Sequence, residues 1–380
     1  GGNSGDDSTF TVSGKAVIKD NLTKGSSTEV NNVACNGTII NVASPGLDSE
    51  AHIGVSTSEI SEGDYKVVAQ GKSSYQMKDT DAERFHSDNG YASKLIGNSI
   101  VFMNGTLHEH AVCGKTGCTE EDHDNTLWIP LTYDSENQRL QYGGKSLKKP
   151  TYDNKYTLPA GNYYLFADIT LDGSIAISGD VNICLNGHTI STKLYNSVFD
   201  INSHKLAVCD CSTGHSGKIE IIDNHSETNP SFVVRLNAAQ LCLYGGTIQG
   251  GDYGAYSNNS SVKLFGGSIT GNTIGVDGSS YDSLTIGGDA KVIDNTTKNL
   301  NLFGIRIDKS LTSNAKIGIT TAAKPSANAN IQIASGASNP KLDYSKIFTS
   351  DATDQNYVVT KDANGNLYLG IHQHKWQATA

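Results

Sequence analysis

The chain has 380 residues, with 29 Lys and Arg against 39 Asp and Glu, which gives a formal net charge of −10. Arg occurs at only four positions, and a binder of nucleic acid needs a basic surface, so the composition argues against nucleic acid as a partner. The sequence has no apolar run near the roughly 20 residues of a transmembrane helix, and a hydrophobic content of 37% is enough for a packed core.

The first eight residues have the Gly, Ser and Asp composition of a flexible linker. We expect them to follow an export signal that is removed on secretion, although the trimmed end of a disordered segment would have the same composition. Up to residue 105, short β-rich runs at 38–42, 65–69 and 100–103 alternate with clusters of Gly, Asn, Asp and Ser. This pattern predicts a small β-rich domain over residues 1–105, with one short helix at 79–85.

Residues 106–150 change character and are predicted to form a Cys/His-rich connector. Five metal-ligand side chains fall close together there: His108, His110, Cys113, Cys118 and His123. Thiolate and imidazole groups at such spacing can surround Zn²⁺ tetrahedrally, and a loop-rich segment with few apolar residues would gain folding free energy from the ion. The sequence therefore predicts a structural zinc site. The alternatives are a Cys113–Cys118 disulfide or ordinary surface histidines.

The next part of the chain repeats itself. The segments 243–248 (LYGGTI), 264–269 (LFGGSI) and 285–290 (TIGGDA) follow one another at intervals of 21 residues. Such a unit is too short for helical repeats, and an antiparallel sandwich, which is the alternative, gives no reason for a fixed period. The pattern suits a parallel β-helix. We therefore predict an all-β fold in which residues 151–320 form coils of about 21–23 residues each.

The alternation within each copy predicts the direction of each side chain. Four side chains are expected to point into the core: Leu241, Leu243, Val262 and Leu264. The glycine pairs of the repeats would supply corners with positive φ. Asn272 and Asn295 stand at matching places, where stacked amides could bond one another. Residues 321–380 lose the repeat and are predicted to be a C-terminal cap and tail that cover the open end of the coils.

Several motifs resemble those of a group of large repetitive exported surface proteins of gut Firmicutes. They lie at 161–165 (GNYYL), 184–190 (CLNGHTI), 209–211 (CDC), 244–248 (YGGTI) and 265–272 (FGGSITGN). The resemblance covers about residues 106–376. It implies a right-handed parallel β-helix at the cell surface. Most proteins of this group have no assigned activity.

Cysteines recur at comparable points of successive coils, as Cys184, Cys209 and Cys242. Because neighbouring strands lie about 4.8 Å apart, stacked thiols fall within disulfide reach, and Cys184–Cys209 is the predicted bridge. The alternative is a ladder of reduced, well-packed thiols. The chain has seven cysteines, so at least one stays outside any intrachain pair.

Two aromatic side chains, Tyr244 and Phe265, are predicted to point outward one above the other. Tyr253 and Tyr256 are expected in neighbouring turns, so that the four rings could stack on sugar rings or on side chains of a partner. Stacked aromatic side chains also stabilise a sheet by themselves, which is the alternative interpretation.

Pectin-degrading enzymes also use parallel β-helices, and their chemistry needs carboxylates clustered on adjacent coils. Here Asp252, Asp277, Asp282 and Asp289 are interpreted as mostly turn residues and Arg235 and Arg306 as isolated. We therefore predict an exported, non-enzymatic cell-surface protein, a stalk or adhesive face that binds a glycan or a host or bacterial surface protein. The alternative is a carbohydrate-active enzyme, a polysaccharide lyase or glycoside hydrolase.

Overall fold

The computed structural model describes residues 10–26, 29–35, 38–115, 118, 123, 125–143, 145–150, 154–193, 197–222, 229–278, 283–301, 304–326, 329–352 and 356–372. Almost every regular element in this part of the chain is a β-strand, which confirms the all-β prediction. Within the same residues there is no helix long and apolar enough to cross a membrane. The segment predicted to be a flexible linker, residues 1–8, lies outside the described residues.

The chain divides into two compact units. The first consists of residues 1–108 with 143–145, and the second of residues 109–142 with 146–380. The predicted β-rich domain thus falls within the first unit. Most of the residues predicted as a Cys/His-rich connector belong to the second unit.

In its described residues the first unit contains two small sheets and one helical turn. One sheet has the strand order β1–β4–β6–β9–β8, and in the other β5 pairs with β2, β3 and β7. The short helix predicted at 79–85 is confirmed in a shorter form, as α1 (Asp79–Ala82). The strands are β1 (Thr11–Gly14), β2 (Val17–Ile18), β3 (Val33–Ala34), β4 (Ile40–Leu47), β5 (His52–Ser56), β6 (Tyr65–Gly71), β7 (Phe85–Ser87), β8 (Ala92–Ile96) and β9 (Ser99–Met103).

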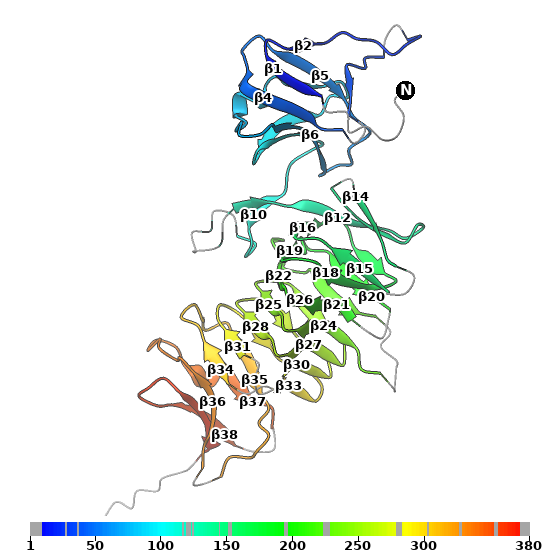
Figure 1. Cartoon of the computed structure of the whole chain (residues 1–380). Coiled ribbons are helices and arrows are strands. Elements are labelled where there is room, and N and C mark those ends of the chain that lie inside the picture. Colours follow the sequence, from blue (N-terminus) through cyan, green and yellow to red (C-terminus); the bar gives the residue numbers. More distant parts are fainter. Residues whose placement is uncertain are drawn as a thin grey trace, which may run out of the picture. The chain divides into compact units, whose positions relative to one another are not determined.

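The second unit contains three long sheets, here called sheets I, II and III (Figure 1). Sheet I consists of β14 (Lys145–Lys148), β13 (Arg139–Tyr142), β12 (Ile129–Asp134), β16 (Gly161–Leu165), β19 (Val181–Cys184), β22 (Lys205–Cys209), β25 (Gln240–Leu243), β28 (Ser261–Leu264), β31 (Ser283–Ile286), β34 (Ile305–Ile307), β36 (Ile331–Ser335), β39 (Leu367–Ile371) and β38 (Tyr357–Lys361). Sheet II consists of β15 (Lys155–Leu158), β18 (Ser174–Ile177), β21 (Ser197–Asn202), β24 (Phe232–Asn237), β27 (Tyr253–Asn258), β30 (Ile274–Gly278) and β33 (Lys298–Asn301).

Sheet III consists of β17 (Ile169–Leu171), β20 (Thr189–Thr192), β23 (Lys218–Ile221), β26 (Thr247–Gln249), β29 (Ser268–Ile269), β32 (Lys291–Val292), β35 (Lys316–Ile319) and β37 (Phe348–Ser350). From β15 to β32 the chain passes through sheets II, I and III in turn, and each strand pairs in parallel with the strand one passage later. The arrangement is solenoid-like. The described residues of the unit also include a separate pair, β10 (Glu109–Ala111) with β11 (Asn125–Leu127), and one 3-10 turn (Tyr344–Lys346).

The register of sheet I confirms the predicted inward positions. Leu241 pairs with Val262 and Leu243 with Leu264, each 21 residues further along the chain. All four side chains are buried in the large apolar core of the second unit. The repeat therefore arises because each strand places its apolar side chains directly above those of the strand before.

The corners of the repeats need glycine for two different reasons. The second glycine of each pair has positive φ, namely +83° at Gly246, +69° at Gly267 and +50° at Gly288. This backbone conformation is strained for residues with a Cβ atom. The first glycine is required by close packing, since a Cβ atom on Gly266 would lie 2.2 Å from the carbonyl oxygen of Tyr244 on the neighbouring coil.

A buried ladder of amides forms the predicted Asn–Asn contact. The Nδ2 atom of Asn272 donates to Oδ1 of Asn295 at 3.0 Å, and Nδ2 of Asn295 donates to Oδ1 of Asn299 at 2.9 Å. Asn299 in turn donates to Asp351 at 2.6 Å. Asn272 also accepts from the backbone N–H of Gly251, so the ladder satisfies backbone groups at the turn before β27.

Antiparallel strands end the parallel stacking of sheet I on both sides. At one end β12 pairs in parallel with β16 and antiparallel with β13. At the other end β36 and β38 both pair antiparallel with β39. These last three strands come from the region predicted to be a C-terminal cap.

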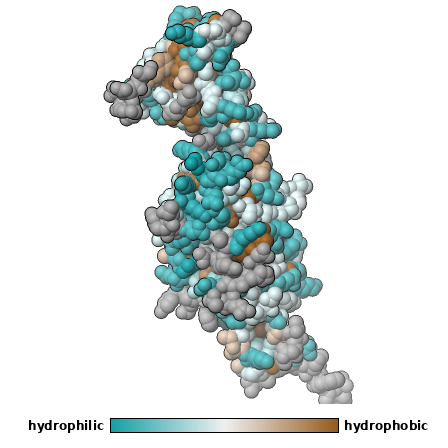
Figure 2. Space-filling model, turned by 90° about the vertical axis from the view of Figure 1, so that its right-hand side faces the viewer, coloured by the Kyte–Doolittle hydropathy of each residue, from teal (hydrophilic) through white to brown (hydrophobic). Residues whose placement is uncertain are grey.

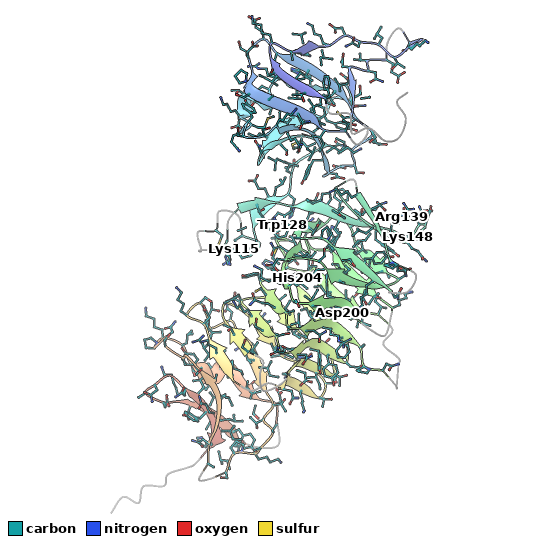
Figure 3. The ribbon with its side chains drawn as sticks, in the orientation of Figure 1. Lys115, Trp128, Arg139, Lys148, Asp200 and His204 are labelled. Carbon is teal, nitrogen blue, oxygen red and sulfur yellow. The ribbon has the colours of Figure 1, made fainter. Side chains whose placement is uncertain are left out.

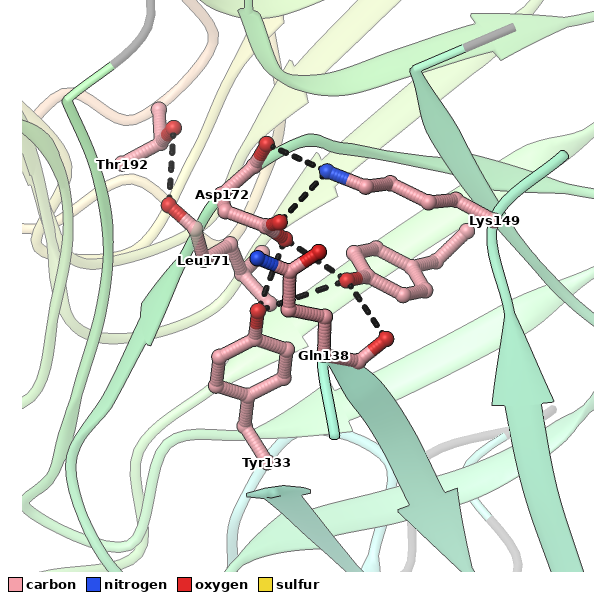
Figure 4. A network of polar contacts seen from close by, with 7 residues as sticks. Tyr133, Gln138, Lys149, Leu171, Asp172 and Thr192 are labelled. Atoms are coloured by element: carbon pink, nitrogen blue, oxygen red, sulfur yellow. Dashed lines mark hydrogen bonds and ion pairs between the residues drawn. The ribbon is translucent and has the colours of Figure 1, made fainter. Parts of the chain in front are cut away.

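A polar network around Asp172 ties β12 to the first strands of sheets II and III (Figure 4). Its Oδ1 atom accepts hydrogen bonds from the hydroxyls of Tyr133 at 2.7 Å and Tyr156 at 2.6 Å. Lys149 Nζ lies 2.5 Å from Oδ2. Burial alone raises the pKa of Asp172, but the hydrogen bonds from Lys149, Tyr156 and Tyr133 more than offset it, so the pKa lies below its ordinary value.

The surface of the second unit has few large apolar side chains. The exposed ones among the described residues are Phe166, Ile222 and Ile371, which lie after β16, after β23 and at the end of β39. On the face shown in Figure 2, hydrophilic residues predominate and apolar ones are scattered. Single exposed apolar residues of this kind are normal for a folded protein and define no docking patch.

The amide ladder predicts a large loss of stability for Asn295→Ala. The substitution leaves the carbonyl oxygens of Ile269 and Ile293 and the side chain of Asn272 without their partner in a buried place. We expect the free energy of unfolding to fall by roughly 2–4 kcal/mol in urea denaturation. As a control, Asn258→Ala removes an exposed asparagine and should change it by about 0.5 kcal/mol or less. Equal losses for the two variants would contradict a structural role of the ladder.

The Asp172 network predicts a dependence of stability on acid. A carboxyl group whose pKa is lowered on folding stabilises the protein above its unfolded pKa, and this contribution is lost as the pH falls through the folded pKa. We therefore expect Asp172→Asn to lower the melting temperature at pH 7 and the difference from wild type to shrink below about pH 4. Thermal unfolding at both pH values measures this. A difference that stays the same at pH 3 and pH 7 would argue against the ionised network.

Candidate functional site

The structure sorts the five predicted metal ligands into two separate groups. His108 and His110 come together with Cys184 and Cys211, and the ligand atoms of these four residues all lie within 4.8 Å of one another. Cys113, Cys118 and His123 form a second group with the same spacing. The structure therefore separates His108 and His110 from Cys113, Cys118 and His123, so the five residues predicted around one zinc ion do not form a single group.

The first group is largely buried. His110 is 3% exposed and Cys184, at the end of β19, is fully buried. The two sulfur atoms, Sγ of Cys184 and Sγ of Cys211, lie 3.5 Å apart. The nearest apolar neighbours form a small cluster of their own, separate from the main core and built on Trp128, Tyr164 and Cys209. Trp128 lies close to β10 (Figure 3), and its Nε1 atom donates to the backbone oxygen of His110 at 3.0 Å.

The second group lies beside Tyr244. Sγ of Cys118 is 3.6 Å from Nδ1 of His123, and Nε2 of His123 is 3.2 Å from the hydroxyl of Tyr244. All three potential ligands are half-buried. Burial raises the pKa of the Cys113 thiol, and the neighbouring Cys118 adds to the shift.

The predicted Cys184–Cys209 disulfide is not present in the structure. The two residues are register partners in β19 and β22, as expected. All seven cysteines lie among the described residues, and each is present as a thiol, so the Cys113–Cys118 alternative is not present either. Cys184 also has a sulfur partner that the sequence spacing did not indicate, since its Sγ atom lies 3.5 Å from Sγ of Cys211.

The predicted outward stack of Tyr244 and Phe265 is confirmed. Their ring centroids are 5.6 Å apart and the ring planes are 15° from parallel. Tyr244 also makes an edge contact with the ring of His123, at 5.1 Å between centroids. One face of this stack is therefore already in contact with the protein's own second His/Cys group.

Tyr253 and Tyr256 do not continue that stack. They lie on β27 of sheet II, not in turns, whereas Tyr244 and Phe265 follow strands of sheet I. On sheet II they join Phe232 of β24, which the sequence analysis missed. Phe232 stacks on Tyr253 with centroids 5.2 Å apart and planes 18° from parallel, and it lies 5.1 Å from Tyr256. We call these three rings the aromatic platform.

Charged side chains surround the platform in the same register. The outward column of sheet II contains Asp200, Arg235, Tyr256, Asp277 and Asn301 on five successive strands. Arg235 is exposed, and its guanidinium carbon lies 5.5 Å from the centroid of the Phe232 ring. The interpretations of Arg235 as isolated and of Asp277 as a turn residue are both wrong, because parallel pairing places residues from distant repeats side by side.

Asp200 differs from the other residues of this column because its carboxylate is buried and one of its oxygens has no hydrogen-bond partner among the described residues. It lies in the middle of β21 (Figure 3) and is 6% exposed. Its Oδ2 atom is 2.8 Å from Nζ of Lys155, while Oδ1 is buried without a hydrogen-bond partner among the described residues. A buried carboxylate oxygen is rarely left unsatisfied, so this atom is a candidate acceptor for a ligand or water.

Tyr253 of the platform is suited to donate a hydrogen bond at neutral pH. Burial, followed by the charge of the nearby Asp277, raises the pKa of Tyr253. Its phenol therefore stays protonated at neutral pH. The face thus combines apolar rings with donors on Tyr253 and Arg235 and acceptors on Asp200 and Asp277.

Comparison of the chain with protein-family models, with curated proteins and with solved structures finds no match.

Proposed function

We propose that this chain is a right-handed parallel β-helix of an exported surface protein, and that it binds glycans through the aromatic platform of sheet II. The observation that carries the proposal is the juxtaposition of Phe232, Tyr253 and Tyr256 with Arg235 on one exposed sheet face. The handedness and the surface location are supported by the resemblance to exported proteins of gut Firmicutes, and the β-helix by the passage of the chain through three sheets in turn.

The chemistry of the platform fits a sugar. The rings are half-buried, so each presents a firm apolar face with little conformational entropy left to lose on binding. The flanking guanidinium and carboxylates can hydrogen-bond to hydroxyl groups at the edge of a ring stacked on them. Binding sites in general combine an apolar surface with a few placed polar groups, and this face has both.

The spacing of the carboxylates favours binding over hydrolysis on this face. Asp200 and Asp277 lie on β21 and β30, three strand spacings apart, which corresponds to about 14 Å along the column. Glycoside hydrolases place their two catalytic carboxyl groups roughly 5–9.5 Å apart. Arg235 and Tyr256 occupy the positions between them. We therefore propose a non-enzymatic adhesive or anchoring role, with a glycan as the partner.

The test is retention of the purified chain on a panel of plant and mucosal polysaccharides, with reducing ends and unsaturated products monitored together. We expect retention without product. The variants Tyr253→Ala and Tyr256→Ala should each weaken affinity by about 5–30-fold, which corresponds to roughly 1–2 kcal/mol for an aromatic contact.

The matched control is Phe265→Ala, which removes a ring from the other aromatic stack, on sheet I, and should leave retention unchanged. Release of product would favour the carbohydrate-active enzyme instead. Retention that depends on Phe265 but not on Tyr253 or Tyr256 would move the binding face to sheet I. Absence of retention on every polysaccharide would leave a spacer or a protein-binding adhesin as the better account.

A further inference from the structure

We propose that His108, His110, Cys184 and Cys211 bind one zinc ion that fixes β10 to the early strands of sheet I. His110, Cys184 and Cys211 belong to the second unit, and His108 is the residue immediately before it. The inference is independent of glycan binding, since none of these residues lies on sheet II. It assigns a role to Cys211, which no sequence pattern had singled out as a ligand.

The ligand set is typical of structural zinc. Two thiols and two imidazoles form one of the standard four-coordinate sets, and the four ligand atoms lie within 4.8 Å of one another. With zinc–sulfur bonds of about 2.3 Å, two sulfurs of a tetrahedral site lie about 3.8 Å apart. The observed 3.5 Å between the sulfurs of Cys184 and Cys211 is close to this value. It is far longer than the bond of about 2.05 Å in a disulfide.

A neighbouring carbonyl group orients one of the imidazoles. Nδ1 of His110 lies 2.7 Å from the backbone oxygen of Ala111. A carbonyl oxygen can only accept, so Nδ1 carries the proton and donates, which leaves Nε2 with a lone pair for a metal. Zinc-binding histidines commonly have such an outer hydrogen bond, because it fixes the tautomer and the orientation of the ring.

The surroundings of the four residues favour a closed, structural site. Cys184 and His110 are buried, and Trp128 packs on the imidazole of His110 with ring centroids 4.5 Å apart. Four protein ligands fill a tetrahedral ion, so no position remains for water or substrate. The residues come from three separate stretches of chain: 108–110, the end of β19 and the segment after β22. An ion would therefore cross-link residues 108–110 to two segments that lie about 75 to 100 residues further along the chain, and the entropic cost of closing a loop grows with its length.

The experiment measures zinc retained by the purified chain after loading under reducing conditions and desalting. We expect Cys211→Ser to lose one equivalent of zinc per chain relative to wild type. Cys113→Ser, the matched control in the second His/Cys group, should keep that equivalent. Cys211 is chosen because it is half-buried, whereas a substitution at the fully buried Cys184 could prevent folding.

Cobalt substitution provides a second readout on the unaltered chain. Co²⁺ in a tetrahedral site with two thiolates gives intense visible absorption and a thiolate-to-cobalt charge-transfer band. Both signals should weaken in Cys211→Ser and persist in Cys113→Ser. In a separate measurement of thermal unfolding, a chelator should lower the melting temperature of wild type but not that of Cys211→Ser. A wild-type chain that retains no zinc and gives no tetrahedral cobalt spectrum would overturn the proposal. Loss of the metal in Cys113→Ser with full retention in Cys211→Ser would also overturn it.

Discussion

The parallel register of each strand on the strand one passage earlier is the constraint on which the second unit depends. Backbone hydrogen bonds fix the spacing of strands at about 4.8 Å, so every side chain has a neighbour directly above and below it. In sheet I this places Leu243 on Leu264 inside the core. In sheet II the same rule places Arg235 between Asp200 and Tyr256 on the outer face. The same parallel pairing thus orders both the side chains of the core and those of the candidate binding face.

That register also explains why particular polar and small residues recur at the corners. An asparagine inside the stack can be buried only if the next coil supplies an amide to bond it, which Asn272 and Asn295 do for each other. At the corner occupied by Gly266 a Cβ atom would lie only 2.2 Å from the carbonyl oxygen of Tyr244 on the neighbouring coil, so only glycine fits there. Such positions tolerate little change because their partners belong to other coils.

The two candidate sites use different parts of this framework. The aromatic platform lies on the strands of sheet II and is positioned by their regular pairing. The His/Cys groups also use residues outside the repeats, since His110 of β10 accepts a hydrogen bond from Trp128, next to β12, and His123 contacts Tyr244, just after β25. A stacked sheet thus provides a regular face for recognition, while the groups suited to hold a metal combine Cys184 of β19 with residues from segments outside the repeats.

The sequence by itself determined the features that repeat locally. The repeat of 21 residues and the alternation of inward and outward side chains along a strand can both be recognised in the sequence. They predict the parallel strands, the inward leucines, the amide ladder and the stack of Tyr244 on Phe265. Only the tertiary structure decided which distant residues meet. Cys211 approaches Cys184 because an irregular segment after β22 returns to the end of β19. Phe232 joins Tyr253 and Tyr256 although strict alternation would put Tyr253 on the side of the buried Ala255. Both contacts join residues whose meeting depends on tertiary packing and not on the period of the repeat.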